Sequence, residues 1–435
     1  MRQDYTVQTE ITPGQRVLIW GFGRHGGGPA AARFCAAQGA QVTILDLKPA
    51  SAFGTAGAAA LAAGWGWAVG DATHPQFLEA ELIVASPAVP PRAWPAVHPP
   101  RCSPEALFFA AHSGPRIAIT GTKGKSTTAH ILATLLGWQV AGNSYEPLLD
   151  ILVRHGPAVP LVCELSSFQL WYLAAQRPRF NGAVFTSLAV DHLDWHQDLN
   201  DYQRSKIALM EWADAVALAP ELQARVAASR PRVAPELTVN YRDGAFHDLE
   251  GVVALRADLP LLGEHNARNS ALAVSMARHM GLARAAVAGG LRRVHGLAHR
   301  LEFVPGSSGL RYCNDSIATT PEAAMAALTA IEGPLVIILG GSDKGADYAT
   351  LAAAVVARGA QAILIGATAE RLATCLRAAG SQPVIAGELS RAVALARQAV
   401  LPGGTVLLSP ACASFDQFQG FEDRGARFRD FANSV

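Results

Sequence analysis

The chain has 435 residues, 50% of them hydrophobic, six cysteines and a formal net charge of +1. This length allows large hydrophobic cores in about two to four domains. The balanced charge does not indicate a nucleic-acid surface. The cysteines form no C-x-x-C pair, which argues against a disulfide framework or a zinc cluster. No apolar run reaches the roughly 18 residues that span a bilayer, and the first residues lack the apolar stretch of a signal peptide, so we expect a cytoplasmic protein.

The first block of the chain alternates apolar strands with alanine-rich helices. Residues 16–20 (RVLIW), 41–45 and 81–85 are predicted strands, and residues 29–37 are a predicted helix. Because strand and helix alternate, we expect a parallel sheet. The proline-rich run over residues 87–104 interrupts this alternation and predicts a linker.

A glycine turn follows the first of these strands. Gly21, Gly23 and Gly26 precede the first helix, and Asp46 stands at the end of the next strand. This spacing is typical of a dinucleotide-binding turn, in which the backbone approaches a pyrophosphate and a carboxylate binds a ribose hydroxyl. The same mechanics would serve a UDP-linked substrate, and a purely structural turn is a third alternative.

The second block opens with a strand that runs into TGTKGKST and then into a helix. Gly121 and Gly124 allow backbone amides to turn toward phosphate oxygens, Lys125 can reach the terminal phosphates, and Ser126 can hold Mg²⁺. The loop is shorter than the standard G-x-x-x-x-G-K-[ST] pattern, since isoleucine replaces its first glycine. The strand and helix around it nevertheless predict a phosphate loop.

Polar residues follow the next two predicted strands, residues 161–163 and 183–185. Ligands of α/β proteins bind at such strand ends. Glu164 could bind Mg²⁺ there, or it could be an ordinary surface carboxylate. Residues 191–196 (DHLDWH) gather two aspartates and two histidines, which could bind metal or phosphate or simply form hydrogen bonds. Lys206, in the helix that follows, reads by itself as a surface lysine.

The third block repeats the alternation of strands and helices. Strands are predicted at residues 335–339, 362–365 and 405–408. One helix start is well marked, because Thr320 can cap it and Pro321 can occupy its first turn. A second α/β domain is therefore expected at the C-terminal end.

Eight ordered motifs of the chain resemble the Mur ligases, the ATP-dependent amino-acid ligases of peptidoglycan precursor synthesis. They cover nearly the whole length and read TGTKGKST (120–127), ELSSFQL (164–170), DHLD (191–194), GEHNARNSALA (263–273), HRLE (299–302), NDSIAT (314–319), LGGSDKGADY (339–348) and SPACASFDQFQGFEDRG (409–425). The short phosphate loop is also typical of this family.

The resemblance implies an α/β protein of three domains, expected to be a monomer. Residues 1–108 would form a Rossmann-like domain for the UDP-linked substrate, residues 109–298 a central ATP-binding domain with a phosphate loop and a mostly parallel sheet, and residues 299–435 a Rossmann-like amino-acid-binding domain. The implied reaction is an ADP-forming ligation. ATP phosphorylates the carboxylate of UDP-N-acetylmuramoyl-L-alanine, and the amine of D-glutamate displaces the phosphate of the acyl phosphate.

Functional residues of the family match positions in this sequence. By resemblance, the ATP site comprises Gly121, Thr122, Lys123, Gly124, Lys125, Ser126, Thr127, Asn266, Asn269, Arg300 and Asp315. The UDP-linked substrate would contact Gly21, Gly23, Gly26, Asp46, Ser86 and Asn143. The incoming glutamate would contact Thr319, Lys344, Ser414 and Phe421.

The resemblance also implies two Mg²⁺ ions and a modified lysine. The expected metal ligands are Ser126, Glu164, His192 and Lys206, and the expected catalytic residues are Lys125, His192, Lys206 and Arg300. Lys206 matches the lysine that the family carboxylates with CO2 to N6-carboxylysine, which turns an ammonium into an anionic carbamate that can face a metal.

Three positions depart from the family pattern. Ile317 replaces the lysine of the usual NDSKAT, Lys123 stands where asparagine is common, and Ala88 replaces the glycine of the usual SPG turn. The loss of a cation at Ile317 leaves open a relative that adds L-glutamate instead of D-glutamate. Alternatives from other classes are an NAD-dependent dehydrogenase and a nucleotide-binding regulatory protein, although the dehydrogenase gives the phosphate loop no role. A folate polyglutamate ligase would share that loop but fits the C-terminal motif less well.

Overall fold

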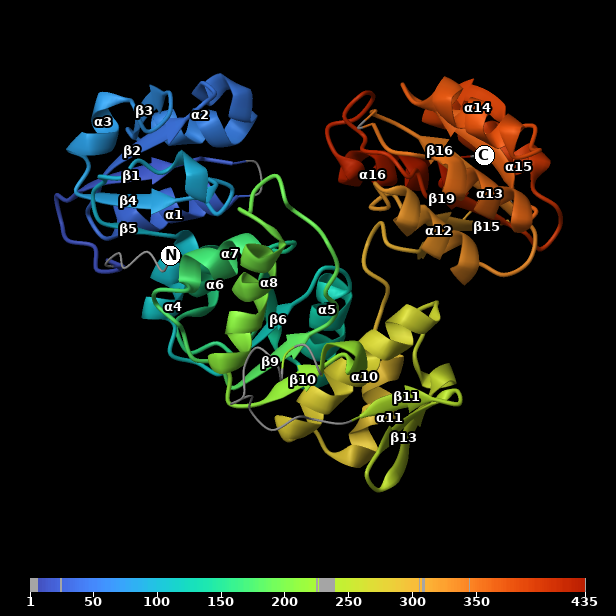
Figure 1. Ribbon diagram of the computed structural model, residues 1–435, viewed down its shortest axis with the longest axis horizontal. Coiled ribbons are helices and arrows are strands. Elements are labelled where there is room, and N and C mark those ends of the chain that lie inside the picture. The colour runs from blue at the N-terminus through green and yellow to red at the C-terminus, as the bar shows by residue number, and fades with distance from the viewer. Residues whose placement is uncertain are drawn as a thin grey trace. The chain divides into compact units, whose positions relative to one another are not determined.

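The computed structural model describes residues 7–23, 26–223, 226, 239–304, 306, 310–343 and 345–434. The chain divides into two compact units (Figure 1). The first unit comprises Met1–Leu259 and Ala267–Val294, and the second comprises Pro260–Asn266 and His295–Val435. The expected division of the first unit at residue 108 falls within a helix, and the three-domain limits stay predictions.

The N-terminal part of the first unit is a parallel sheet with the strand order β3-β2-β1-β4-β5. Its strands are β1 (Arg16–Trp20), β2 (Gln41–Asp46), β3 (Gly66–Val69), β4 (Leu82–Ala85) and β5 (Arg101–Cys102). Its helices are α1 (Gly27–Ala37), α2 (Gly54–Ala62) and α3 (Pro75–Glu79), with 3-10 turns at Ala50–Phe53 and Pro91–Ala93. The apolar run of β1 is buried after its first residue, as expected for a middle strand that is covered on both faces.

The prediction of a linker over residues 87–104 is wrong for part of that run. β5 pairs in parallel with β4, with Arg101 opposite Ile83 and Cys102 opposite Val84, and so adds an edge strand to the sheet. The next helix, α4 (Pro104–Ala111), begins at the last proline of the run. The prolines therefore bound short elements here instead of marking a domain linker.

The central part of the first unit is a second parallel sheet, with the order β10-β9-β6-β8-β7. Its strands are β6 (Arg116–Thr120), β7 (Gln139–Gly142), β8 (Leu161–Glu164), β9 (Gly182–Phe185) and β10 (Val216–Leu218). Its helices after α4 are α5 (Lys125–Leu136), α6 (Leu148–His155), α7 (Ser167–Leu173) and α8 (Leu199–Ile207), with 3-10 turns at Ala208–Glu211 and Pro220–Leu222. Since β6 is the middle strand, the phosphate loop leaves the sheet between the carboxyl ends of β8 and β9.

A small antiparallel sheet follows, and the sequence analysis assigned no strand to it. Its strands are β11 (Asn240–Arg242), β12 (Ala245–Asp248) and β13 (Gly251–Leu255), with 3-10 turns at Arg256–Asp258 and Arg284–Ala286 and the helices α10 (Glu264–His279) and α11 (Val287–Arg292) nearby in sequence. Asp243 and Gly244 form the β11–β12 turn with positive φ angles of 50° and 71°. An Asp-Gly pair between short strands is a recognised hairpin signal.

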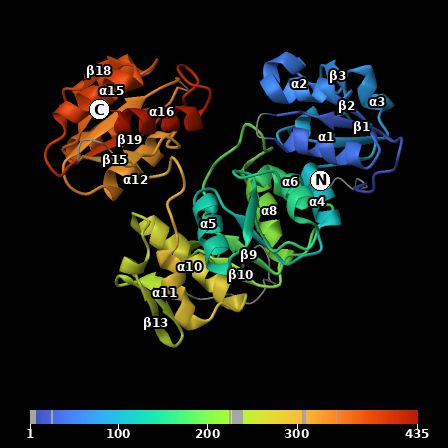
Figure 2. The ribbon, with the colours of Figure 1, turned by 180° about the vertical axis from the view of Figure 1, so that it is seen from behind.

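The second unit is a six-stranded sheet with helices on both faces (Figure 2). The order is β14-β15-β19-β16-β17-β18, and only β14 is antiparallel to its neighbour. The strands are β14 (Glu302–Val304), β15 (Arg311–Asn314), β16 (Leu335–Gly340), β17 (Gln361–Ile365), β18 (Val384–Gly387) and β19 (Thr405–Leu408). One face carries α12 (Pro321–Ala330), α13 (Ala349–Ala357) and α14 (Ala369–Ala378), and the other carries α15 (Leu389–Ala399) and α16 (Phe421–Asn433). The predicted start of α12 is confirmed, because the Thr320 hydroxyl accepts a hydrogen bond from the Ala323 amide.

An aromatic cluster joins the N-terminal sheet to the central part of the first unit. Trp20 on β1 packs edge-on against Phe77 and Trp94, with ring centroids 5.0 and 4.9 Å apart. The Trp94 indole donates a 3.0 Å hydrogen bond to the hydroxyl of Tyr172 on α7. Trp195, from the loop after β9, is buried in the same cluster. The two sheets are thus held together by large apolar side chains, whose burial stabilises such contacts by about 25 cal/mol per Å².

Candidate active site

The phosphate loop after β6 requires its two glycines. Gly124, the residue just before α5, has φ 84°, and Gly121 has φ 149°. A Cβ on Gly121 would lie 2.0 Å from the Thr186 hydroxyl, and a Cβ on Gly124 would lie 2.7 Å from the Asn269 amide oxygen. The second distance also places Asn269, on α10, over the loop, as expected for a residue of the ATP site. Both positions combine a backbone conformation that favours glycine with a lack of space for any side chain.

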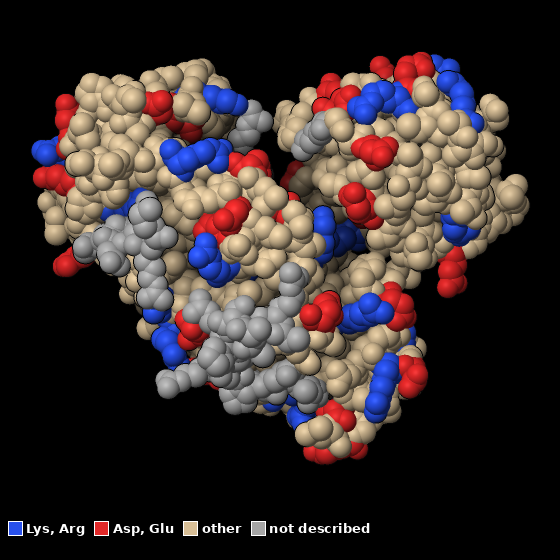
Figure 3. Space-filling view, viewed as in Figure 1, with Lys and Arg blue, Asp and Glu red and all other residues tan. Residues whose placement is uncertain are grey.

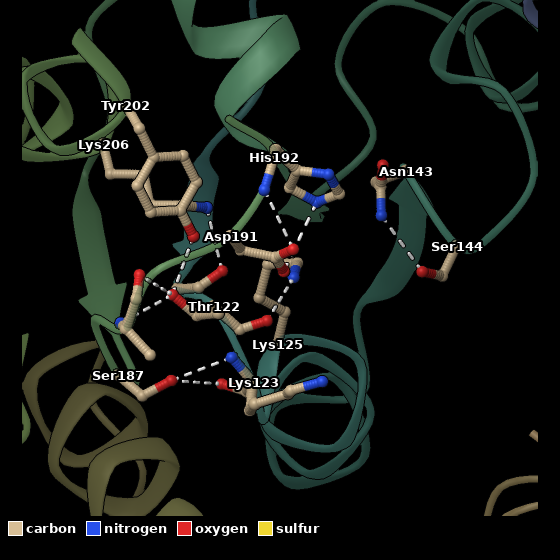
Figure 4. A network of polar contacts seen from close by, with 12 residues as sticks. Thr122, Lys123, Lys125, Asn143, Ser144, Ser187, Asp191, His192, Tyr202 and Lys206 are labelled. Atoms are coloured by element: carbon tan, nitrogen blue, oxygen red, sulfur yellow. Dashed lines mark hydrogen bonds and ion pairs between the residues drawn. The ribbon is translucent and has the colours of Figure 1, made fainter. Parts of the chain in front are cut away.

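Neighbouring elements hold this loop from its sides (Figure 4). The Thr122 amide donates to the Ser187 carbonyl at 2.9 Å, and the Lys123 amide donates to the Ser187 hydroxyl at 2.8 Å. The Thr122 hydroxyl lies 2.7 Å from that of Tyr202 on α8. Lys125 donates to the Thr122 carbonyl at 3.1 Å. The loop is therefore fixed before any ligand binds, which lowers the entropic cost of binding a phosphate.

Lys206 is buried behind the loop, contrary to the reading of a surface lysine. The residue is 2% exposed, and its side-chain nitrogen donates a 2.9 Å hydrogen bond to the Gly121 carbonyl. Burial lowers the pKa of Lys206 well below its usual value, and the nearby Lys125 lowers it further, while Asp191 and Glu164 act in the opposite direction. Lys206 therefore loses its proton far more easily than an ordinary lysine.

Glu164 ends β8, next to the strand that carries the phosphate loop. One carboxylate oxygen accepts hydrogen bonds from the Asn143 amide at 3.0 Å and the Ser144 hydroxyl at 2.9 Å. The other oxygen, Oε2, is buried with no hydrogen-bond partner among the described residues. A buried carboxylate oxygen without a donor is costly unless a cation neutralises it. This observation fits the expected metal-binding role of Glu164.

His192 lies in the exposed loop after β9 and has a positive φ of 54°. Its ring lies 3.5 Å from the Asp191 carboxylate. Burial lowers the pKa of His192, and Lys206 and Lys125 lower it further, whereas Asp191 raises it. A neutral imidazole is the form that can bind a metal ion. The charges of Lys125 and Lys206 reach His192, so the structure brings three of the four expected catalytic residues into one neighbourhood.

Two neighbouring positions of the ATP motif differ in exposure. Thr127 is 3% exposed, while Ser126 is half-buried at the start of α5. Of the two hydroxyls, that of Ser126 is the more accessible to a ligand. Asn266, in the first turn of α10, is buried and donates to the Leu262 carbonyl at 2.7 Å.

The N-terminal glycine turn is built from residues distant in sequence. A Cβ on Gly21 would lie 3.0 Å from the Cβ of Ser86, so the two predicted substrate positions are in contact. A Cβ on Gly26 would lie 3.0 Å from Pro147 of the central part, whereas Gly23 has open space around it. Asp46 accepts hydrogen bonds from the Phe22 amide at 2.8 Å and the Lys48 amide at 3.0 Å. Asp46 thus fixes the turn itself, and a contact with substrate stays a prediction.

Asn143 lies beside the carboxylate of Glu164, a position that the sequence analysis did not foresee. Its backbone amide donates to the Glu164 carbonyl at 3.0 Å, and its side chain donates to the Glu164 carboxylate. A residue expected to touch the muramoyl arm is therefore in direct contact with a residue expected to bind Mg²⁺.

Two expected nucleotide contacts, Arg300 and Asp315, lie in the second unit. The Nε of Arg300 is buried with no hydrogen-bond partner in the described chain. Asp315 accepts hydrogen bonds from the Ser409 hydroxyl at 2.7 Å and the Leu301 amide at 3.2 Å. Burial raises the pKa of Asp315 to about 6. That these two residues contact the same nucleotide as the phosphate loop of the first unit stays a prediction.

Arg424, a residue that the sequence analysis missed, joins the segments that carry Ser316 and Cys412. Arg424 is fully buried in the first turns of α16 and donates to the Ser316 hydroxyl, the Ser316 carbonyl and the Cys412 carbonyl at 2.8 to 3.0 Å. The Ser316 hydroxyl in turn donates to the Phe421 carbonyl at 2.8 Å. Ser414, two residues beyond Cys412, is buried. In sequence, an arginine near the start of a helix gives no sign of this role.

The other two residues expected to bind glutamate are Thr319 and Lys344. Thr319 is half-buried after the same segment, and so is Ile317, at the position where the family carries lysine. The Ile317 amide donates to the His299 carbonyl at 3.1 Å, so its backbone is anchored although its side chain carries no charge. Lys344 lies outside the described residues.

The described surface carries charges of both signs. On the face in Figure 3, basic and acidic side chains are interspersed over both units.

Among the described residues, no helix is long and apolar enough to cross a membrane. No group of three or more His, Cys, Asp and Glu side chains in the described ranges is arranged to hold a metal ion.

Comparisons with known proteins agree with these features. The Mur ligase middle domain matches residues 119–277, and the glutamate ligase domain of the Mur ligases matches residues 299–412. A UDP-N-acetylmuramoylalanine--D-glutamate ligase from Roseiflexus sp. (strain RS-1) is 34% identical over 465 residues, covering 97% of this chain and 99% of that relative.

Solved structures share the fold at low sequence identity. A UDP-N-acetylmuramate-alanine ligase from Thermotoga maritima superposes with a TM-score of 0.61 at 15% identity, covering 95% of this chain and 98% of that chain. A MurF ligase from Thermotoga maritima, solved in complex with ADP, superposes with a TM-score of 0.57 at 13% identity, covering 98% of this chain and 96% of that chain.

Proposed function

The chain belongs to the Mur ligase family, and from this we propose that it joins D-glutamate to UDP-N-acetylmuramoyl-L-alanine at the expense of ATP. This ADP-forming ligation serves peptidoglycan synthesis. The observation that carries the proposal is the arrangement behind the phosphate loop. There, the buried amine of Lys206 contacts the loop, and the unpartnered oxygen of Glu164 lies at the neighbouring strand end.

The chemistry calls for positioning and charge neutralisation by the protein. A carboxylate cannot react with an amine directly, because its oxygen is a poor leaving group. ATP therefore phosphorylates the carboxylate of the UDP-linked substrate, and the glutamate amine displaces phosphate from the acyl phosphate. The amides of the loop and the ammonium of Lys125 would stabilise the phosphoryl group during transfer, and no enzyme nucleophile is needed.

We propose that Ser126, Glu164, His192 and a carboxylated Lys206 hold two Mg²⁺ ions. Bound Mg²⁺ would neutralise charge on the phosphate oxygens. The unpartnered Oε2 of Glu164 and the lowered pKa of His192 fit this role. The lowered pKa of Lys206 favours the neutral amine that must react with CO2. The carbamate formed would supply an anionic ligand where the unmodified side chain supplies a cation.

The remaining proposals concern the ligand contacts of the second unit, the oligomeric state and the domain limits. Arg300 and Asp315 are proposed to contact the nucleotide, and Thr319, Lys344, Ser414 and Phe421 to bind glutamate. We propose a monomer with domain limits near residues 108 and 298. An NAD-dependent dehydrogenase would leave the phosphate loop and Lys206 without a role, and we do not propose it.

The function is tested by measuring phosphate release from ATP. We expect release only when UDP-N-acetylmuramoyl-L-alanine and glutamate are both present, with the ligated product identified by mass spectrometry. Turnover that does not depend on the muramoyl acceptor would contradict the proposal, as would ATP binding without any turnover.

A second candidate is ligation of L-glutamate by the same site, and Ile317 favours it. A cation within reach of the amino-acid carboxylates restricts how the substrate can be oriented, and such a charged hydrogen bond is worth about 1.5 to 3 kcal/mol. Isoleucine at this position removes that restriction. D- and L-glutamate supplied in parallel assays decide between the two, because the enantiomer with the higher kcat/KM is the substrate.

A further inference from the structure

The loop at residues 189–196, which we name the bridging loop, runs between the two ligand sites of the first unit. At its first residue, the Ala189 amide donates to the Thr122 hydroxyl of the phosphate loop at 3.0 Å. At its other end, the Trp195 indole donates to the Ala88 carbonyl at 3.2 Å. His192, a proposed metal ligand, lies between these two anchors.

The turn at residues 86–89, which we name the substrate turn, belongs to the proposed site of the UDP-linked substrate. Ser86 packs against Gly21 of the glycine turn, and its hydroxyl accepts a hydrogen bond from the Ala88 amide at 3.3 Å. Two successive carbonyls of the turn are bound by side chains of the central part. Trp195 binds that of Ala88, and the Tyr172 hydroxyl binds that of Val89 at 2.9 Å.

Trp195 also fixes the surroundings of His192. Its ring stacks on Phe168 with centroids 4.5 Å apart and planes 24° apart, and the same Phe168 ring contacts His192 edge-on at 4.8 Å. The backbone amide of Trp195 donates to the His192 carbonyl at 3.1 Å. One side chain therefore touches the substrate turn on one side and the packing partner of His192 on the other.

The middle of the bridging loop has little support of its own. Val190 is 65% exposed and Leu193 is 48% exposed, whereas Trp195 is 6% exposed. A second tether reaches the same end, because Arg92 donates to the Asp194 carbonyl at 2.6 Å. An exposed segment takes its position largely from its anchors, which here are the two ends of the loop and the packing of His192 on Phe168. A shift of the substrate turn would therefore be passed to His192.

We propose that Trp195 is a positioning residue that couples binding of the UDP-linked substrate to assembly of the metal and nucleotide site. This inference rests on the proposed function of the site. Asn143, which binds the Glu164 carboxylate, supplies a second and shorter link between the same two sites. By thermodynamic linkage, the substrate must favour Mg²⁺–nucleotide binding by the same factor as Mg²⁺–nucleotide favours the substrate.

The test is calorimetric titration of the full chain with UDP-N-acetylmuramoyl-L-alanine, with and without Mg²⁺ and a non-hydrolysable ATP analogue. In the unsubstituted protein we expect the analogue and Mg²⁺ to tighten substrate binding about tenfold, within the usual range of such couplings. Trp195→Phe keeps an aromatic ring on Phe168 but removes the indole N–H. In this variant we expect the analogue and Mg²⁺ to tighten substrate binding less than about twofold; we call this tightening the coupling factor.

Trp171→Phe is the matched control. Trp171 lies in the same aromatic cluster, 5.7 Å from Trp195, and its indole makes no hydrogen bond among the described residues. This variant should retain the coupling factor. Should Trp195→Phe fail to fold, Arg92→Gln tests the same tether through an exposed side chain and should also reduce the factor.

The outcomes separate this inference from the proposed function. If the unsubstituted protein binds the UDP-linked substrate but the coupling factor is absent, or survives in the folded tether variant, the inference is overturned. If the unsubstituted protein binds no UDP-linked substrate, the proposed function itself fails. A coupling factor lost equally in both tryptophan variants would also overturn the role given to Trp195, because general damage to the cluster would then explain it.

Discussion

Two glycine turns in the first unit share one backbone geometry but have opposite electrostatic surroundings. Gly26, just before α1, has φ and ψ of 82° and −11°, and Gly124, just before α5, has 84° and −9°. Each turn follows the middle strand of a five-stranded parallel sheet. The first is fixed by the carboxylate of Asp46, whereas the second lies beside the amines of Lys125 and Lys206. Because the backbones of the two turns match, we expect the side chains around them to decide which compound each turn would accept.

The largest expected effect comes from removing the buried amine behind the second turn. Lys206→Ala should abolish ligation, because it removes both the contact with the Gly121 carbonyl and the proposed carbamate. Added acetate should partly restore phosphate release by replacing the carbamate. The control is Arg204→Ala, an exposed position on the same helix. Undiminished activity of Lys206→Ala would remove this residue from the mechanism.

The next largest effect on activity is expected from Lys125, the cation on the second turn itself. Lys125→Ala should lower kcat for phosphate release by about 10²- to 10³-fold, the usual cost of removing one donor from a developing negative charge. Lys48→Ala, on an exposed lysine beside the first turn, serves as the comparison and should leave kcat within about twofold. Equal losses in the two variants would show that the cations of the two turns do not differ in role.

A smaller effect is expected at the first turn. Asp46→Asn weakens the hydrogen bond that holds the Phe22 amide, and a charged hydrogen bond is worth about 1.5 kcal/mol or more. We therefore expect KM for the UDP-linked substrate to rise about tenfold, while KM for ATP stays unchanged. Steady-state kinetics with each substrate varied in turn give both values. Asp71→Asn, in an exposed turn of the same part of the chain, is the control.

The smallest effect compares the stability cost of a methyl group at each turn. A left-handed backbone costs a residue with a Cβ about 1 to 2 kcal/mol. Gly14→Ala measures this cost alone, because a Cβ there has no neighbour within 4 Å. Gly26→Ala and Gly124→Ala add close contacts with Pro147 at 3.0 Å and with Asn269 at 2.7 Å. The free energy of unfolding in urea should therefore fall least for Gly14→Ala and most for Gly124→Ala, and the reverse order would contradict this steric account.

The strands around the turns could be predicted because their pattern is local. The predicted strand 16–20 coincides with β1, and 405–408 coincides with β19, since short apolar runs are typical of covered parallel strands. β5 could not be predicted, because two residues in a proline-rich run carry no pattern of their own. Its pairing with β4 comes from the fold around it.

The site was predictable in its residue types but not in its contacts. Strand-end positions placed Glu164 next to the phosphate loop, and the register of β6 with β8 confirms this. The burial of Lys206 could not be read from a helix that carries other charged residues. The same holds for the hydrogen bonds from Asn143 to Glu164 and from Trp195 to Ala88, because they join loops that are distant in sequence. Such contacts depend on how the two sheets pack, which periodicity does not encode.

The aromatic cluster gives the first unit an optical signature of its own. All eight tryptophans of the chain lie at or before residue 212, and four of them (Trp20, Trp94, Trp171 and Trp195) belong to the cluster between the two sheets. Intrinsic fluorescence excited at the indole band therefore reports on the first unit alone, and half of its tryptophans lie at the junction of the two sheets. Circular dichroism of the backbone sees both units, so the two signals together distinguish melting of one unit from melting of the other.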